Sequence, residues 1–251
     1  MGDGLVAMRN ETVEGSPRAF VHRAHSGRFG ILNAESGYQN LVRFLFGDVR
    51  VDGVLKVNGL TLPPAVYRKW EKNPDKRLRA SYHFETVVRV RGARWDLHRR
   101  VAAEASAVFR KYEELQGADE ALRHPHLFST FLSASGWAKA NARRPYLGFS
   151  IELRIRVPEF VLDGAFLLDD HHEGSNIFSD TILVDVAPPK GRAGRWRVRY
   201  GFDSSTPGRA TRPLEVVPFE GGARLAIPVR QPNHPSIDAV LELTARPWNR
   251  S

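Results

Sequence analysis

The sequence contains no cysteine, and its longest apolar run, residues 160–168, is interrupted by Asp163 and Gly164. The absence of cysteine excludes disulfide bonds, thiolate metal sites and a cysteine nucleophile. No run approaches the roughly 18 apolar residues that a membrane-spanning helix needs. Hydrophobic residues still make up 42% of the 251 residues, which is usual for a globular protein. The length suits one large domain or two small ones.

Acidic side chains are scarce relative to basic ones, with 28 Asp and Glu against 37 Lys and Arg, for a net charge of +9. Such an excess favours a negatively charged partner, and an anionic membrane surface is one candidate. Nucleic acid is not expected as a partner, because no nucleic-acid-binding motif accompanies the charge. The alternation of Arg195, Arg197 and Arg199 is typical of the solvent side of a strand, so Trp196, on the opposite side, is expected in the core.

The first part of the chain has a mixed α/β pattern. Residues 18–22 read as a short strand, and residues 35–46 as a helix that ends at Gly47. The apolar residues of this helix lie on one face, at Tyr38, Leu41, Val42 and Leu45. Residues 49–57 resemble a hairpin with Asp52-Gly53 at its tip.

Short strand patterns separated by Gly and Pro follow from about residue 60 to the end. Residues 148–157 give the clearest example, since every second residue from Phe149 to Val157 is apolar and Ser150, Glu152 and the arginines alternate with them. This alternation indicates a half-buried antiparallel strand. Many such strands at short spacing predict a sandwich. The predicted fold is therefore mainly β, an antiparallel β-sandwich over residues 61–251 preceded by a short α/β segment over residues 1–60.

Two motifs near the N-terminus carry residues suited to ester hydrolysis. Gly2-Asp3-Gly4-Leu5-Val6 presents a carboxylate in a turn, and His25, in the loop Ala24-His25-Ser26, follows about twenty residues later. In hydrolytic triads a carboxylate fixes the tautomer of a histidine, which in turn takes a proton from a serine. The order acid then histidine is the order of the last two triad members in α/β-hydrolases.

Together with residues 38–48, these motifs resemble the acid loop, histidine loop and final helix of lipase-like α/β-hydrolases. The group includes enzymes of the lecithin-cholesterol acyltransferase and GPI inositol-deacylase types. The resemblance covers residues 1–60, about a quarter of the chain. It implies that Asp3 is the triad acid and His25 the triad base; His22, inside the strand pattern, fits less well. It also implies an ester or lipid substrate for the intact protein.

The chain departs from this family because it contains no Gly-x-Ser-x-Gly. Gly148-Phe149-Ser150 lacks the second glycine and falls inside an alternating strand, whereas the family's serine occupies a strand-to-helix turn. We therefore expect the C-terminal portion of a serine acyl-hydrolase, lipase- or esterase-like, with the nucleophile encoded before Met1 and no activity on its own. The alternative is that the sandwich is a non-catalytic binding module for lipid, an anionic surface or a protein partner.

A cluster of possible ligands, Asp169-Asp170-His171-His172-Glu173, follows the apolar run. Oxygen and imidazole donors at this density could bind a divalent cation. Adjacent residues of a strand point to opposite faces, however, so the five side chains do not converge without a curled loop. The cluster is interpreted as a solvated hairpin connection, and no metal or cofactor is expected.

Overall fold

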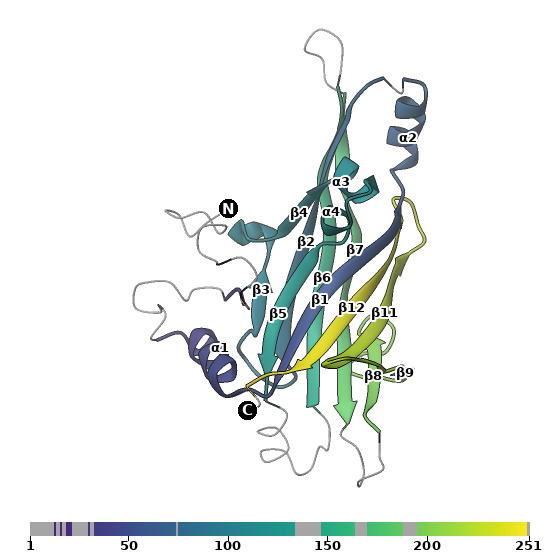
Figure 1. Ribbon diagram of the computed structural model, residues 1–251. Coiled ribbons are helices and arrows are strands. Elements are labelled where there is room, and N and C mark those ends of the chain that lie inside the picture. The colour runs from purple at the N-terminus through teal and green to yellow at the C-terminus, as the bar shows by residue number, and fades with distance from the viewer. Residues whose placement is uncertain are drawn as a thin grey trace.

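A computed structural model describes residues 13, 16, 19–21, 30, 33–73, 75–133, 147–163, 170–187 and 195–249 of the chain. Two antiparallel sheets pack face to face and share one hydrophobic core (Figure 1). The prediction of a mainly β fold is confirmed. None of the described helices is long and apolar enough to cross a bilayer.

The helices and strands follow one another along the chain from a single N-terminal helix to a C-terminal strand. In order they are α1 (Glu35–Phe46), β1 (Val49–Leu60), α2 (Pro64–Glu71), β2 (Leu78–Val90), β3 (His98–Arg100), a short 3-10 turn (Ala102–Glu104), β4 (Val108–Lys111), α3 (Tyr112–Gln116), α4 (Glu120–Arg123), β5 (His126–Leu132), β6 (Leu147–Leu162), β7 (Asp170–Ala187), β8 (Arg197–Phe202), β9 (Arg212–Leu214), β10 (Val217–Phe219), β11 (Gly222–Gln231) and β12 (Ile237–Pro247).

The smaller sheet has the strand order β10-β11-β12-β1-β5, and the larger has the order β3-β2-β6-β7-β8-β9, with β4 also paired to β2. β1 lies between β12 and β5 as one continuous strand. The hairpin predicted over residues 49–57 is therefore wrong. Asp52 and Gly53 lie inside the strand because Gly53 has no side chain to displace the ring of Phe128, which lies against it. The sandwich thus begins at residue 49, before residue 61, where we expected its start.

The alternation predicted for residues 148–157 is confirmed, because the five apolar residues from Phe149 to Val157 are all buried. The strand continues further than expected, through Pro158 to Leu162. Proline lacks the N–H needed for a ladder and is found at irregularities in strands. Here the pairing of β6 with β2 is interrupted beside Pro158, and Gly174 on β7 approaches it so closely that a Cβ there would meet its carbonyl oxygen.

Helix α1 lies where the sequence predicts it, ending at Gly47, but its orientation is the reverse of the expected one. Asn40 is its only buried residue. Of the four apolar residues of the pattern, Tyr38, Leu41 and Leu45 are 57%, 56% and 50% exposed, and Val42 is partly buried. The side of α1 that carries Asn40 and Phe44 thus faces the sandwich, and the side that carries Tyr38, Leu41 and Leu45 faces away from it.

Candidate functional site

The residues that the resemblance implies for catalysis, Asp3 and His25, lie outside the described residues, as does His22. The structure therefore does not place them relative to one another. Upstream of α1, the carbonyl oxygen of Phe20 accepts a hydrogen bond of 3.0 Å from the Arg99 amide. The guanidinium of Arg100 lies 4.5 Å from the centre of the Phe20 ring. This contact brings the chain before α1 against the edge strand β3.

Ser150, the serine of the incomplete Gly-x-Ser pattern, is the fourth residue of β6 and lies opposite Arg89 on β2 and Leu183 on β7. This confirms the expectation that it sits inside an alternating strand. A nucleophilic serine in this family stands on a sharp turn between a strand and a helix. Ser150 has no such turn.

A Ser, His and Asp do meet on the outer face of the smaller sheet. Asp52 pairs directly with Ser129 in the register of β1 and β5. His126 would point to the other face of β5 in a regular strand, because it lies three positions before Ser129, an odd number. An irregularity between Gly53 and Val54 leaves one extra residue in β5 and turns His126 to the same face. No signal in the sequence predicts this bulge, so the cluster was missed.

The arrangement of the cluster is not that of a hydrolytic triad. Ser129 Oγ donates to Asp52 Oδ1 at 2.5 Å, and His126 Nε2 lies 3.1 Å from the same Oγ. A triad needs the histidine between the two, with one ring nitrogen on each. Here the same Nε2 is also the ring nitrogen near Asp52, at 3.8 Å from Oδ1.

The carboxylate of Asp52 is held ionised in this cluster. The residue is only 8% exposed, and Arg50 Nη2 lies 2.8 Å from its Oδ1. Burial acts to raise the pKa of Asp52, but hydrogen bonds from the three neighbouring side chains outweigh it and lower the pKa to about 2. Such a carboxylate is a weak proton acceptor near neutral pH. The cluster therefore ties β1 to β5 and is not suited to activate Ser129.

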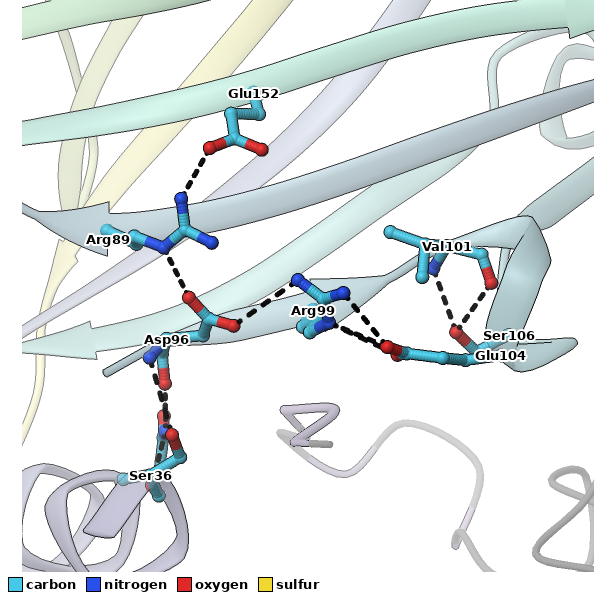
Figure 2. Close-up of polar contacts among 9 residues, drawn as sticks. Ser36, Arg89, Asp96, Arg99, Val101, Glu104, Ser106 and Glu152 are labelled. Atoms are coloured by element: carbon cyan, nitrogen blue, oxygen red, sulfur yellow. Dashed lines mark hydrogen bonds and ion pairs between the residues drawn. The ribbon is translucent and has the colours of Figure 1, made fainter. Parts of the chain in front are cut away.

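The polar side of α1 is anchored by a network on the larger sheet, drawn in Figure 2. Asn40 Nδ2 donates to the Asp96 carbonyl oxygen at 3.0 Å, and the Asp96 amide donates to Ser36 Oγ at 3.4 Å. The Asp96 carboxylate in turn binds Arg89 Nε at 2.5 Å and lies 3.7 Å from Arg99 Nη1. The helix is thereby fixed to the connection between β2 and β3.

The other end of α1 is anchored to the smaller sheet. The ring of Phe44 packs edge-on against Phe131 of β5, with centroids 5.0 Å apart. The Trp248 Nε1 and Asn249 Nδ2 groups, just after β12, both donate to the Phe44 carbonyl oxygen at 2.7 Å. Helix α1 is therefore held both by the β2–β3 connection and by the smaller sheet.

The outward side of α1 forms an apolar stripe of Tyr38, Leu41, Leu45 and Phe46, the last 76% exposed. No Lys or Arg lies among these four residues. Large exposed apolar stripes on a helix mark a surface that another apolar surface covers. The absence of basic residues distinguishes this stripe from helices that lie on anionic membranes.

Trp196 was predicted in the core, and this prediction is wrong. The residue immediately precedes β8 and is 50% exposed. Arg195 and Arg197, on either side of it, are exposed too. The alternation of buried and exposed residues does not extend to Trp196, because β8 begins at Arg197 and Trp196 is not paired with β7.

Residues 170–173 lie in the paired part of β7 rather than in a hairpin connection, so that interpretation is wrong; Asp169 lies outside the described residues. Asp170 Oδ2 binds Lys69 Nζ at 2.7 Å. This hydrogen bond is the main reason that the pKa of Asp170 lies below its usual value. His171 Nδ1 lies 3.1 Å from Glu159 Oε2. Among the described residues no group of three or more His, Asp or Glu side chains could hold a metal ion.

Comparison of this chain with family models, curated proteins and solved structures finds no match.

Proposed function

We propose that the chain is the C-terminal portion of a serine ester hydrolase, lipase- or esterase-like, acting on an ester or lipid substrate. The observation that carries the proposal is the ordered pair of motifs at Asp3 and His25, followed at the right distance by the helix at residues 35–46. The serine and the oxyanion hole would come from polypeptide encoded before Met1. Residues 49–249 would then be an appended sandwich.

In the proposed reaction Asp3 accepts a hydrogen bond from one ring nitrogen of His25 and fixes its tautomer. The other ring nitrogen takes the proton of the serine as its oxygen attacks the ester carbonyl carbon. The same proton then passes to the leaving alcohol, and an acyl-serine ester remains. Water, deprotonated by His25, hydrolyses that ester and returns the serine.

Two structural observations support a nucleophile that lies outside the sandwich. The apolar stripe of α1 is turned away from the sandwich, as expected if a further body of the same protein covers it. The Ser–His–Asp cluster of the sandwich has the wrong order for catalysis, so within the described residues Ser129 does not compete with an upstream serine for the role of nucleophile.

The test is hydrolysis of a p-nitrophenyl ester and labelling with a fluorophosphonate probe, which marks activated serines. We expect the 251-residue chain to show neither, and Ser129→Ala to behave like the unaltered chain. Ester hydrolysis by this chain that survives both His25→Ala and Asp3→Asn would overturn the proposal, because neither residue would then serve the reaction.

The second candidate is that the sandwich itself is the functional unit, a non-catalytic module for an anionic surface. The exposed Trp196 between two exposed arginines favours it. Long-range attraction from the net charge of +9 would bring such a module to a negative surface. Cosedimentation with anionic vesicles at low salt tests it, and equal recovery on neutral vesicles would contradict it.

A further inference from the structure

Trp196 and its two neighbours lie at one end of the sandwich, which we call the basic end and define by Arg195, Trp196 and Arg197. β6 begins, β7 ends and β8 begins at this end, where Ala187 pairs with Arg197 (Figure 1). Helix α2 lies at the opposite end of the sandwich (Figure 1). The two ends can therefore be compared within one molecule.

The arginines of the basic end have no ion-pair partner among the described residues. No described carboxylate lies within ion-pair distance of Arg195 or Arg197, whereas Arg50, Arg89 and Arg154 are examples of strand arginines that have such a partner. Arg199 differs, because it stands opposite Asp185, whose Oδ1 already binds Arg91 at 2.8 Å. Two guanidinium groups close together at the start of one strand, without a carboxylate partner among the described residues, are suited to bind phosphate.

The two connections that lead into β6 and β8 are basic in composition. Residues 134–146 and 188–194, which join β5 to β6 and β7 to β8, lie outside the described residues. They contain five basic residues and no acidic one, namely Lys139, Arg143, Arg144, Lys190 and Arg192. These residues contribute to the net charge of +9, and the proposed site is limited to Arg195, Trp196 and Arg197.

Trp196 makes a lipid surface a better match than a nucleic acid. A half-exposed indole has an apolar ring and a polar N–H, the combination that is enriched at membrane–water interfaces. Nucleic acids bind instead to basic grooves with several aromatic rings on which successive bases stack. In the described part of the basic end, Trp196 is the only exposed aromatic residue.

We propose that the basic end is a docking site for anionic phospholipid membranes, with Arg195 and Arg197 on the lipid phosphates and Trp196 in the interfacial layer. The inference rests on the second proposed function and names its site. It also suits the first, because a lipid hydrolase reaches its substrate at such a surface. It assigns no role to the apolar stripe of α1, which has no basic residue.

The experiment measures partition of the full 251-residue chain onto vesicles of phosphatidylcholine with or without phosphatidylserine, at low and at high salt. The variants are Arg195→Gln/Arg197→Gln and Trp196→Ala. The matched control is Arg68→Gln/Lys72→Gln, which removes the same charge from exposed residues at α2, at the opposite end. Circular dichroism and the urea midpoint verify that each variant is folded.

We expect the double Arg variant to bind phosphatidylserine vesicles about 10- to 30-fold more weakly, since each basic residue near the surface contributes about 1 kcal/mol. Trp196→Ala should weaken binding about fivefold and do so at high salt as well, because its contribution is apolar. The α2 control should change binding by less than about twofold, since charges beyond a Debye length of about 10 Å are screened.

Each failure has a distinct meaning. If the unaltered chain does not prefer phosphatidylserine vesicles, the second proposed function fails. If it does, but the α2 control and the basic-end variant lose affinity equally, membrane binding stands as a net-charge effect and the assigned site is wrong. Tighter binding to single-stranded DNA than to vesicles, lost in the same Arg variant, would overturn the lipid and assign a nucleic acid instead.

Discussion

Strand β6 and helix α1 both carry a clear amphipathic pattern, yet they use it in opposite ways. The apolar side of β6, from Phe149 to Val157, is buried between the sheets. Tyr38, Leu41 and Leu45 of α1 are exposed, whereas its opposite side is fixed through Asn40 to Asp96 and through the Phe44 carbonyl oxygen to Asn249. The apolar side of β6 is therefore buried within the sandwich, whereas the apolar stripe of α1 is not part of the sandwich core. An amphipathic pattern thus predicts that an apolar face will be covered, but it does not predict whether the same domain or another polypeptide covers it.

The largest effect is expected on the inner side of β6. Ile155 is completely buried, so Ile155→Ala should lower the free energy of unfolding by about 2–5 kcal/mol, through lost burial and the cavity left behind. The neighbouring Arg156→Ala, on the outer side, should cost less than about 1 kcal/mol. Urea unfolding monitored by circular dichroism measures both. Equal losses would show that the two sides of β6 do not differ in packing.

A smaller, pH-dependent effect is expected at Asp52. Its pKa in the folded chain, about 2, lies below the usual value for aspartate, so the ionised form stabilises the fold above pH of about 4. This stabilisation, about 2 kcal/mol, is lost as the pH falls from about 4 towards 2. Over that range the unaltered chain should lose about 2 kcal/mol more than Asp52→Asn. Parallel stability–pH curves for the two would contradict the ionised cluster.

The smallest effects bear on α1 and test its reversed orientation. Asn40→Ala removes hydrogen bonds to the Ser36 and Asp96 carbonyl oxygens and should cost about 1 kcal/mol. Leu41→Gln, on the exposed stripe, should change stability by less than about 0.5 kcal/mol. Urea midpoints of the two variants give the comparison directly. A larger loss for Leu41→Gln would mean that the stripe is covered within this chain.

The regular parts of the fold could be predicted from the sequence. The position of α1, the alternation in β6 and the mainly β class all follow from periodicity, because each depends on neighbours along the chain. The strand β1 was misread at Asp52-Gly53, a pair that favours turns. The misreading arose because the ring of Phe128, which occupies the space beside Gly53, comes from a distant strand.

The features of the candidate sites could not be predicted in the same way, because they depend on contacts between residues far apart in the sequence. The bulge that turns His126 towards Ser129 is set by the register of β5 on β1, which periodicity does not encode. The exposure of Trp196 depends on where β8 begins. Asp3 and His25 come from the motif resemblance alone, so their roles stay predictions.

The most direct measurement of the central proposal is the reading frame of the coding DNA upstream of the Met1 codon. If the chain is the C-terminal portion of a serine ester hydrolase, the frame continues upstream without a stop and encodes a Gly-x-Ser-x-Gly between a strand pattern and a helix pattern. The longer protein should then hydrolyse esters and lose that activity in His25→Ala. An in-frame stop codon close upstream, with no such motif after it, would contradict the account.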